Sequence, residues 1–383
     1  MSLLVEEIEP KMPLRKKVVI IGGGVIGLSI GWQLAKNSFD VTIYDRNWAG
    51  QGASWAAAGM LSPRAEVHMQ ASDLLQLGLA SAELYPEWVG ELESDSQISV
   101  DYRTHGTLMV SLDRDDQAEL EHHYSMQLAL DLPVEWLTGA EAREIEPYLS
   151  PRVTSAVSCK KDFQVDNRLM VQALIQAFEK FGGNLLQQTP VCKIEIQNEK
   201  AIGIRVEEKF IEADLIVLSA GCWSSQIEGL PDWARPPVRP VKGQMIAVRM
   251  DVPTILQHVI YAPDAYLAPK SDGRLLIGAT CEEQGFNTNI TAGGMFELLR
   301  GAWEVLPSVY ELPIDETWVG LRPGSRDNAP ILGKTQINNL IMATGHYRQG
   351  ILLTPVTCRE ISSLIMTDQP SSLIAPFMLE RFV

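Results

Sequence analysis

The feature that most constrains the fold of this chain is a glycine-rich turn between a short apolar strand and a helix. Four consecutive β-branched residues, 18–21, predict a buried parallel strand. The strand runs into a G-x-G-x-x-G pattern made of Gly22, Gly24 and Gly27. In this pattern the first glycine allows a tight turn, the second lets a pyrophosphate approach the backbone, and the third lets the following helix pack closely on the strand.

A second strand and an acidic residue complete the pattern. Residues 28–36 predict a helix, whose N-terminus would present free N–H groups to phosphates. Residues 41–44 predict a second strand that ends at Asp45, whose carboxylate can accept hydrogen bonds from a ribose. A plain glycine-rich turn would explain the glycines but not Asp45. The order of strand, glycines, helix, strand and acid therefore predicts a dinucleotide site in a Rossmann-like α/β domain.

Length and charge limit the classes of function. The 383 residues are enough for one large domain or two interleaved ones. The formal net charge of -16 argues against nucleic acid or an anionic membrane as a partner. No apolar run reaches the length of a transmembrane helix, and residues 1–17, which we expect to be a disordered lead-in, lack the apolar core of a signal peptide. We therefore expect a cytoplasmic protein.

The cysteines and histidines give no pattern of a metal site. The five cysteines are odd in number, scattered and never in C-x-x-C, which is typical of free, buried thiols in a reducing cytosol. The histidines form no H-E-x-x-H, and neither a Walker A loop nor G-x-S-x-G is present. These absences favour a site without metal.

A run of small residues after Asp45 carries a resemblance to a known family. Residues 50–61 read GQGASWAAAGML, which predicts a short, tightly packed helix whose backbone passes close to a bulky group. Ser54 in this run can donate to a phosphate. With the dinucleotide pattern, the run resembles the flavin-dependent amine oxidases of the D-amino acid oxidase superfamily, most closely the glycine oxidases of thiamine biosynthesis. The same resemblance is carried by residues 164–168 (QVDNR), 241–244 (VKGQ), 321–323 (LRP) and 345–348 (GHYR).

The resemblance implies FAD as the cofactor and the residues that hold it. Related sarcosine oxidases tether the flavin to a cysteine near the strand that would carry Arg322. No cysteine occurs between Cys281 and Cys358, so we expect non-covalent FAD. Asp45 departs from the glutamate common in the family, and the N-terminus of the last helix is expected to face the flavin. The expected cofactor-binding residues are Gly22, Gly24, Val25, Ile26, Gly27, Asp45, Arg46, Ser54, Ala57, Ala58, Gly59, Met60, Val191, Ala220, Gly221, Trp223, Arg348, Gly350, Ile351 and Leu352.

The remaining periodicity predicts two interleaved lobes. Helices are expected at residues 71–93, 113–130, 169–181, 291–304 and 351–366. Thr138 and Glu141 predict a capping box that opens another short helix. Strands expected at 238–250, 258–261, 266–269, 275–280 and 314–322 predict a mostly antiparallel sheet. Asp272 and Gly273 predict a hairpin turn between two of these strands. We expect an FAD-binding domain of residues 16–92, 149–235 and 325–383, and an α+β substrate-binding domain of residues 93–148 and 236–324.

Three side chains are candidates for binding a substrate carboxylate. Tyr266 lies on an expected strand, Arg322 at a strand end, and Arg348 between glycines before the last helix. An arginine fork binds a carboxylate bidentately. Without the resemblance, Arg322 fits a surface ion pair better and Tyr266 fits a packed aromatic equally well. The resemblance implies that the Tyr266 hydroxyl and an arginine bind the carboxylate, and we expect Arg348 to be that arginine, with Arg322 nearby.

The sequence therefore predicts an FAD-dependent oxidase of small amines. Glycine is the expected substrate, with sarcosine and small D-amino acids as secondary ones. The products would be an imino acid, then glyoxylate and ammonia, with oxygen reduced to hydrogen peroxide. We expect a homo-oligomer, such as a tetramer, and a hand-off of product to thiazole synthase. Two alternatives stay open: a dehydrogenase that passes electrons to a quinone or carrier, and a non-catalytic dinucleotide-binding regulator.

Overall fold

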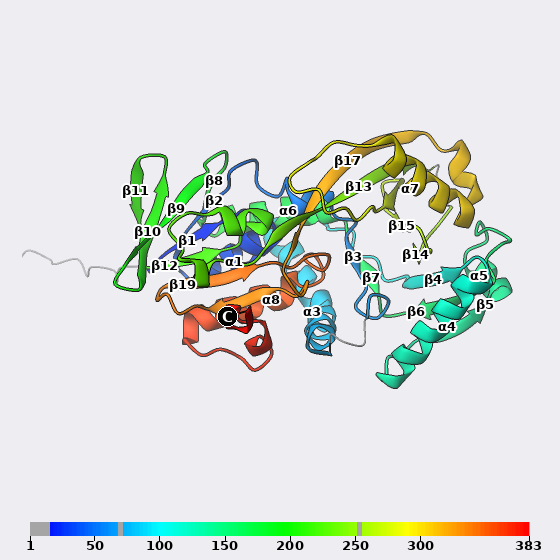
Figure 1. Ribbon diagram of the computed structural model, residues 1–383, viewed down its shortest axis with the longest axis horizontal. Helices are drawn as coiled ribbons and strands as arrows, with labels where there is room; N and C mark the ends of the chain where they lie inside the picture. Colours follow the sequence, from blue (N-terminus) through cyan, green and yellow to red (C-terminus); the bar gives the residue numbers. More distant parts are fainter. Residues whose placement is uncertain (1–15, 68–71, 251–254, 383) are drawn as a thin grey trace, which may run out of the picture.

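Two lobes lie side by side along the long axis of the molecule (Figure 1). The computed structural model describes residues 16–67, 72–250 and 255–382, so the expected disordered lead-in falls almost wholly outside the described residues. Each lobe is built around its own sheet, and the long strands β13 (Arg239–Arg249) and β17 (Ile314–Gly324) reach from the second lobe toward the first.

A largely parallel sheet forms the centre of the first lobe. Its strand order is β18-β19-β12-β1-β2-β8, and pairing is parallel from β19 to β8, with β18 antiparallel at one edge. The strands are β1 (Lys17–Ile21), β2 (Asp40–Tyr44), β8 (Asn184–Leu186), β12 (Leu215–Leu218), β18 (Ile331–Lys334) and β19 (Leu340–Thr344). Because parallel strands end at the same edge, the segments that follow β1, β2, β12 and β19 meet there.

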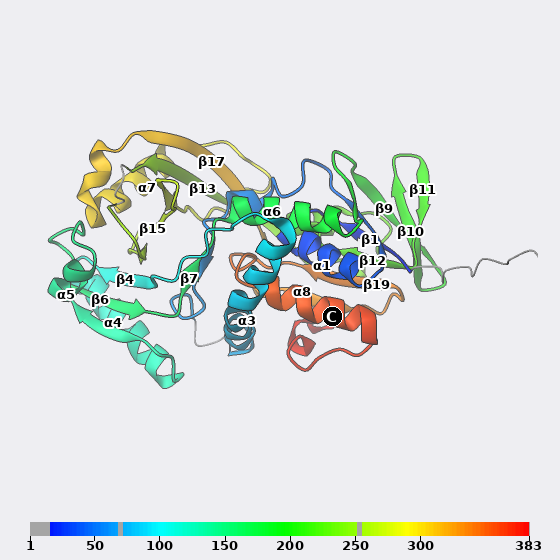
Figure 2. The same ribbon diagram turned by 180° about the vertical axis from the view of Figure 1, so that it is seen from behind.

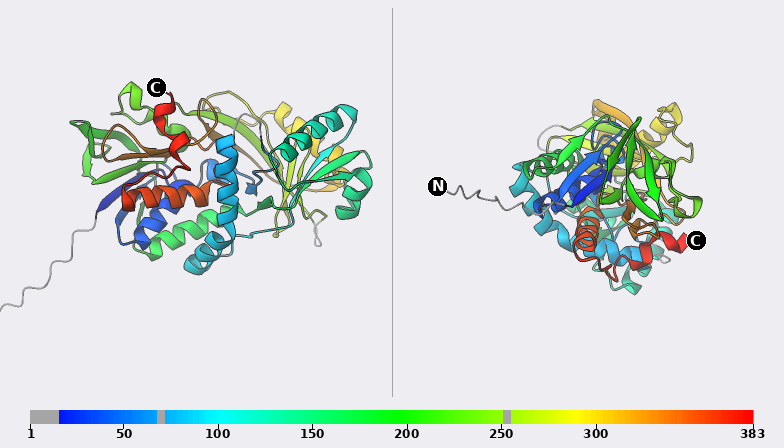
Figure 3. Two further views of the ribbon diagram at one scale, coloured as in Figure 1. Left: turned by 90° about the horizontal axis from the view of Figure 1, so that it is seen from below. Right: turned by 90° about the vertical axis from the view of Figure 1, so that its left-hand side faces the viewer.

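Both faces of this sheet are covered by other elements, which explains why apolar residues on β1 do not alternate with polar ones. Val18 and Ile20 pack against the helices, whereas Val19 and Ile21 face the opposite side. Figures 2 and 3 show the helices gathered on one side of the first lobe. They are α1 (Val25–Lys36), α3 (Ser72–Ser96), α6 (Asn167–Lys180) and α8 (Thr354–Thr367). The other face meets a three-stranded sheet of β9 (Val191–Gln197), β10 (Lys200–Val206) and β11 (Lys209–Glu212).

The second lobe contains the mostly antiparallel sheet that the sequence predicts. Its order is β17-β13-β16-β15-β14-β4-β6-β5, and among the described strands of this sheet only β14 and β4 pair in parallel. The shorter strands are β4 (Thr107–Ser111), β5 (Glu135–Thr138), β6 (Ser155–Cys159), β14 (Val259–Tyr261), β15 (Tyr266–Pro269) and β16 (Arg274–Gly278). Strand β6 pairs in this sheet although it follows residue 148, where we expected the chain to return to the first lobe. The division into domains itself stays a prediction.

Capping groups fix where several helices begin. The Oδ1 of Asp113 accepts hydrogen bonds from the backbone N–H groups of Asp115 and Asp116, in the first turn of α4 (Arg114–Ala129). Thr138 and Glu141 form the expected capping box at the start of α5 (Gly139–Ile145). Helix α7 (Ala292–Val305) follows the cap Thr291. Helix α8 begins three residues later than expected, because residues 350–353 form turns before it. Among the described residues, no helix has the length and apolar character needed to cross a membrane.

Candidate functional site

Four strand ends meet at a cavity of about 690 Å³ that continues to β15 and β17 of the second lobe. Gly22 follows β1 with a φ of +108°, and a Cβ there would lie 2.4 Å from the carbonyl oxygen of Ser219, after β12. A Cβ on Gly27 would lie 2.0 Å from the carbonyl oxygen of Gly22. Both positions therefore need glycine: the first for its turn and the second for the close packing of α1 on β1.

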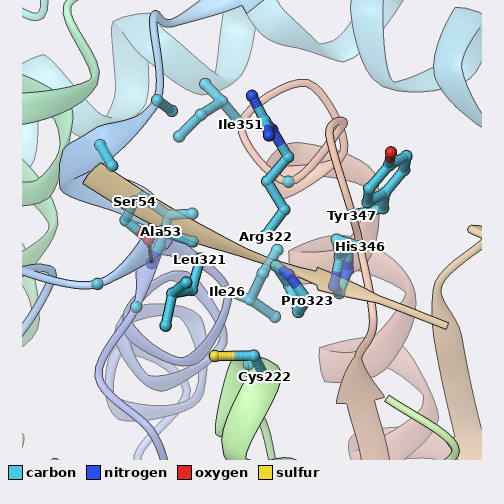
Figure 4. Close-up of a pocket in the computed structure, with 18 of the residues that line it drawn as sticks. Ile26, Ala53, Ser54, Cys222, Leu321, Arg322, Pro323, His346, Tyr347 and Ile351 are labelled. Atoms are coloured by element: carbon cyan, nitrogen blue, oxygen red, sulfur yellow. Dashed lines mark hydrogen bonds between the residues drawn. The ribbon is translucent and has the colours of Figure 1, made fainter. Parts of the chain in front are cut away.

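The N-terminus of α1 offers an open cradle. A Cβ on Gly24 would meet only Ser54 Oγ, at 3.2 Å, so little protein stands in front of it. The backbone N–H of Val25 donates to Ser54 Oγ at 3.0 Å, and Ser54 comes from the short helix α2 (Ala53–Ala56) (Figure 4). A phosphate that enters here meets helix N–H groups and the positive end of the helix dipole.

Asp45 ties the end of β2 to the glycine turn. Its Oδ2 accepts the backbone N–H of Gly23 at 2.8 Å, and its Oδ1 accepts that of Asn47 at 2.8 Å. Burial raises the pKa of this carboxyl, and the two backbone hydrogen bonds oppose the rise. The carboxylate is thus fixed in place at the cavity, and the expected contact with a ribose stays a prediction.

The cavity gathers nearly all of the residues that the sequence singled out for a cofactor. Gly27 does not line it, because this glycine packs α1 on the strand. Arg46 places its guanidinium 4.9 Å from the centre of the Trp223 ring, which also stacks on Phe286 from the second lobe. The lining candidates are Gly22, Gly24, Val25, Ile26, Asp45, Arg46, Ser54, Ala57, Ala58, Gly59, Met60, Val191, Ala220, Gly221, Trp223, Arg348, Gly350, Ile351 and Leu352.

Helix α3 holds the turn that precedes α8 at the cavity. The hydroxyl of Tyr85, which is fully buried, donates to the carbonyl oxygen of Ile351. Ser81 Oγ donates to the carbonyl oxygen of Leu352. These two bonds position the backbone of the turn, so the cofactor candidates Gly350, Ile351 and Leu352 line the cavity from a fixed segment.

Tyr266 and Arg322 from the second lobe and Arg348 from the first all line the cavity. Arg322 Nη1 donates to the carbonyl oxygens of Lys242 at 3.3 Å and Thr280 at 3.0 Å. Figure 4 shows the Arg322 side chain extending from β17 to the same side as Tyr347. The backbone therefore fixes one arm of the guanidinium and leaves the rest of the fork for another partner.

Two glycines make room for these side chains. A Cβ on Gly243 would lie 2.5 Å from both Nη atoms of Arg322. A Cβ on Gly278 would lie 2.4 Å from the hydroxyl oxygen of Tyr266. The positions of Arg322 and Tyr266 thus depend on the absence of side chains on the neighbouring strands β13 and β16.

Arg348 stands at the mouth of the cavity. It is exposed, and its guanidinium lies 5.2 Å from the centre of the Tyr347 ring. Cys281 Sγ lies 3.5 Å from the Tyr347 hydroxyl. The expectation of buried thiols is wrong for Cys281 and Cys192, which are both exposed: Cys192, on β9, lines the cavity, and Cys281 follows β16.

The polar residues of the cavity that sequence reasoning missed include Glu66, Tyr261 and His346. Tyr261 carried a signal, because it pairs with Tyr266 across the short β14–β15 hairpin. Glu66 carried none, since it comes from a loop between β3 (Met60–Leu61) and α3. Burial lowers the pKa of His346 to about 3, so this ring is neutral, and its Nε2 lies 3.1 Å from Thr357 Oγ1.

A family model described as "FAD dependent oxidoreductase" matches residues 17–364. The chain belongs to this family. The FAD-dependent oxidoreductase is 34% identical to a protein named glycine oxidase from Geobacillus kaustophilus, over 97% of this chain and 98% of that protein. It is 37% identical to the bifunctional protein ThiO/ThiG of Synechocystis over 97% of this chain, and it spans 55% of that relative's length.

The crystal structure of glycine oxidase from Geobacillus kaustophilus superposes on this FAD-dependent oxidoreductase with a TM-score of 0.88, covering 96% of this chain and 99% of that one, at 34% identity. The residues present fit FAD, because the open cradle at Gly24 and the ends of four strands share one cavity with the turn before α8. When bound there, FAD would be held by the glycine turn after β1, by Ser54 and by the turn before α8.

Proposed function

We propose that this FAD-dependent oxidoreductase oxidises glycine, with sarcosine and small D-amino acids as secondary substrates and oxygen as the electron acceptor. The observation that carries the proposal is a tyrosine and two arginines, Tyr266, Arg322 and Arg348, in the same cavity as the glycine-rich turn. Such a group suits a carboxylate. Relatives of full length that are named glycine oxidase support the choice of glycine.

The side chains bind and orient the substrate. Arg322 is fixed by the two carbonyl oxygens that its Nη1 contacts, so its remaining N–H groups meet a carboxylate without first losing freedom. The Tyr266 hydroxyl supplies a further donor, and Arg348 adds positive charge at the mouth. When bound non-covalently in the cavity, FAD would supply the acceptor for the hydride of the substrate Cα and the route of the electrons to oxygen, which gives hydrogen peroxide. The imino acid then hydrolyses to glyoxylate and ammonia.

The bifunctional relatives suggest where the product goes. They carry the names ThiO and ThiG in one chain, and the present chain spans about half of their length. We propose that the imino acid can pass to thiazole synthase, and that the chain forms a homo-oligomer, such as a tetramer, in the cytoplasm.

A peroxide assay tests the proposed function. The holoenzyme is given glycine, sarcosine, D-alanine and D-proline in air, and peroxide is measured for each. We expect the highest kcat/KM with glycine. Peroxide from none of the four would contradict the proposal.

Anaerobic reduction separates an oxidase from the dehydrogenase alternative. Glycine should bleach the flavin without air, and readmitted oxygen should restore its colour within a turnover. A flavin that glycine bleaches but only a quinone reoxidises would identify a dehydrogenase. A flavin that no amine bleaches would favour the non-catalytic regulator.

A further inference from the structure

Glu66 brings a carboxylate to the cavity that holds Tyr266 and the two arginines. Glu66 lines the cavity and is partly buried. The hydroxyl of Tyr261 donates a hydrogen bond to Glu66 Oε1. Tyr261 and Tyr266 are cross-strand partners on the β14–β15 hairpin, and their ring centres lie 6.1 Å apart. The hairpin therefore holds the Glu66 carboxylate one side chain away from Tyr266.

The loop that carries Glu66 is pinned in place. The backbone N–H groups of Arg64 and Ala65 both donate to Asp162 Oδ2, at 3.0 and 2.8 Å. Gln127 Nε2 donates to the carbonyl oxygen of Arg64 at 2.9 Å. Asp162 and Gln127 are fully buried, so the loop is anchored from inside the second lobe. A carboxylate on such a loop presents its charge to the cavity from a fixed position.

The charge of Glu66 reaches the other members of the group. Burial raises the pKa of Tyr266; Arg322 and Arg348 oppose the rise, and Glu66 adds to it. Although Arg348 is exposed, the partial desolvation of its guanidinium would lower its pKa, but its neighbours Cys281 and Tyr347, together with Glu66, raise it. Two cations and one anion therefore lie close enough to Tyr266 to act on its hydroxyl. This arrangement matches the two opposite charges of an amino acid zwitterion.

We propose that Glu66, held by Tyr261, receives the amino group of the substrate while the arginines receive its carboxylate. The inference rests on the proposed function, because it assumes that the substrate is an amino acid. It goes further by giving the cavity a basis for selectivity. An ammonium group can pair with the Glu66 carboxylate, whereas a carboxylic acid with no amine brings no positive charge to place beside it.

The test compares two ligands of similar size in the holoenzyme. Glycine carries an ammonium group, and glycolate carries a hydroxyl group in its place. Their dissociation constants are measured under anaerobic conditions from the change in flavin absorbance at early times, and steady-state kinetics are recorded in parallel. We expect Glu66→Gln to weaken glycine binding about tenfold or more and to leave glycolate binding unchanged or tighter. Tyr261→Phe should shift glycine in the same direction by a smaller factor.

A neighbouring carboxylate supplies the matched control. Asp264 also lines the cavity, but its side chain pairs with Arg300 at 3.1 Å. Asp264→Asn should change neither dissociation constant, and if it reproduces the Glu66→Gln pattern, the effect belongs to the overall charge of the cavity and the proposal is wrong. Flavin content and thermal unfolding are checked for each variant.

Two further outcomes would overturn the role of Glu66. One is a Glu66→Gln enzyme that binds glycine as the wild type does. The other is an equal loss for glycine and glycolate, which would make Glu66 a residue that only shapes the cavity. Failure of the proposed function would look different, because the wild type would then bind glycine without flavin reduction or peroxide. The dissociation constants of glycine and glycolate can still be compared in that case, so the role of Glu66 is tested separately from the reaction. If the Glu66→Gln variant does not retain flavin, glycine and glycolate binding are compared in the Tyr261→Phe variant instead.

Discussion

Arg322 and Arg348 differ in how the protein holds them. Arg322 is half-buried and has one Nη bound to two backbone carbonyl oxygens, whereas Arg348 is exposed beside Tyr347. A fixed fork binds a carboxylate with little further loss of entropy, and an exposed one first has to be ordered. We expect Arg348 to be the main anchor of the substrate carboxylate, but Arg322 is a second candidate in the same cavity. A substitution can decide between the two arginines.

Replacing Arg348 with alanine should weaken apparent glycine binding by about thirtyfold. Removing one partner of a desolvated charge pair costs roughly 2–5 kcal/mol, and ~1.4 kcal/mol is tenfold, so the lower limit applies to a residue at the mouth. Arg348→Lys should recover only part of the loss, because an ammonium cannot reproduce the bidentate fork. Steady-state kinetics on glycine and the flavin content of each variant measure the effect.

Arg326→Ala is the control for this prediction, because Arg326 is exposed and does not line the cavity. It should leave the KM for glycine unchanged. An Arg348→Ala enzyme with the wild-type apparent affinity would show that Arg322 and Tyr266 hold the carboxylate without Arg348.

His346 should make the protein sensitive to acid. Burial lowers its pKa from 6.5 to about 3, so between these values the unfolded chain binds more protons than the folded one. The free energy of unfolding should therefore fall as the pH falls through this window, by at most about 1.4 kcal/mol per pH unit from this residue. His346→Gln should flatten the dependence in urea unfolding between about pH 7 and about pH 5. The same change at the exposed His122 should leave the dependence as it is.

At the scale of elements, periodicity and capping residues located most strands and helices. The β-branched run before Gly22, the hairpin turn at Gly273 and the capping box at Thr138 are local signals, and each appears where the sequence predicts it. The start of α8 was placed too early, because apolar residues 351–353 fit a helix but form turns that α3 holds. A contact between segments so distant in sequence leaves no periodic trace in either one.

The bond from α3 to that turn can be tested with two tyrosines. Tyr85→Phe leaves the buried carbonyl of Ile351 without this donor, which should destabilise the fold by roughly 1–3 kcal/mol and weaken FAD binding. Tyr102→Phe is the matched control, because its ring stacks on Tyr85 at 6.1 Å and its hydroxyl has no hydrogen-bond partner among the described residues. Urea unfolding and FAD titration of the apoproteins should separate the two variants. Equal stability would show that packing of the Tyr85 ring, and not its hydroxyl, holds the turn.

At the scale of the whole molecule, the cavity depends on how the two lobes meet. Lys270, at the end of β15, is fully buried and donates to the carbonyl oxygens of Ala58 and Val165 at 2.7 Å, next to the small-residue run. The sequence indicated the run and the strand separately, but nothing in it pairs Lys270 with those carbonyls. In the same way, nothing in the sequence places Glu66 at the site, because the conformation of its loop brings it there. The glycine turn was predictable because consecutive residues carry its pattern, whereas the substrate end is assembled from several segments that lie far apart in the sequence.

Because FAD would occupy a cavity that residues of both lobes line, its binding should stabilise the whole fold. A ligand that binds only the folded state adds about 2.7 kcal/mol at a hundredfold excess over its Kd and ~1.4 kcal/mol for each further tenfold. We expect the unfolding midpoint of the apoprotein to rise steadily with added FAD. Both lobes should unfold in one transition that shifts as a unit. The measurement is thermal unfolding followed by far-UV circular dichroism and by tryptophan fluorescence over a range of FAD concentrations.

Gly24→Val supplies the matched variant for this whole-molecule effect. A branched side chain there fills the open space in front of the α1 N-terminus, where the nearest atom to a Cβ is Ser54 Oγ at 3.2 Å. The apoprotein should fold about as well as the wild type, since no other protein atom lies within reach of the new Cβ, but its midpoint should not respond to FAD. A Gly24→Val protein that is stabilised as strongly as the wild type would place the pyrophosphate away from the glycine turn. A wild-type protein in which FAD shifts one transition and leaves a second unmoved would show that the cofactor couples to only one lobe.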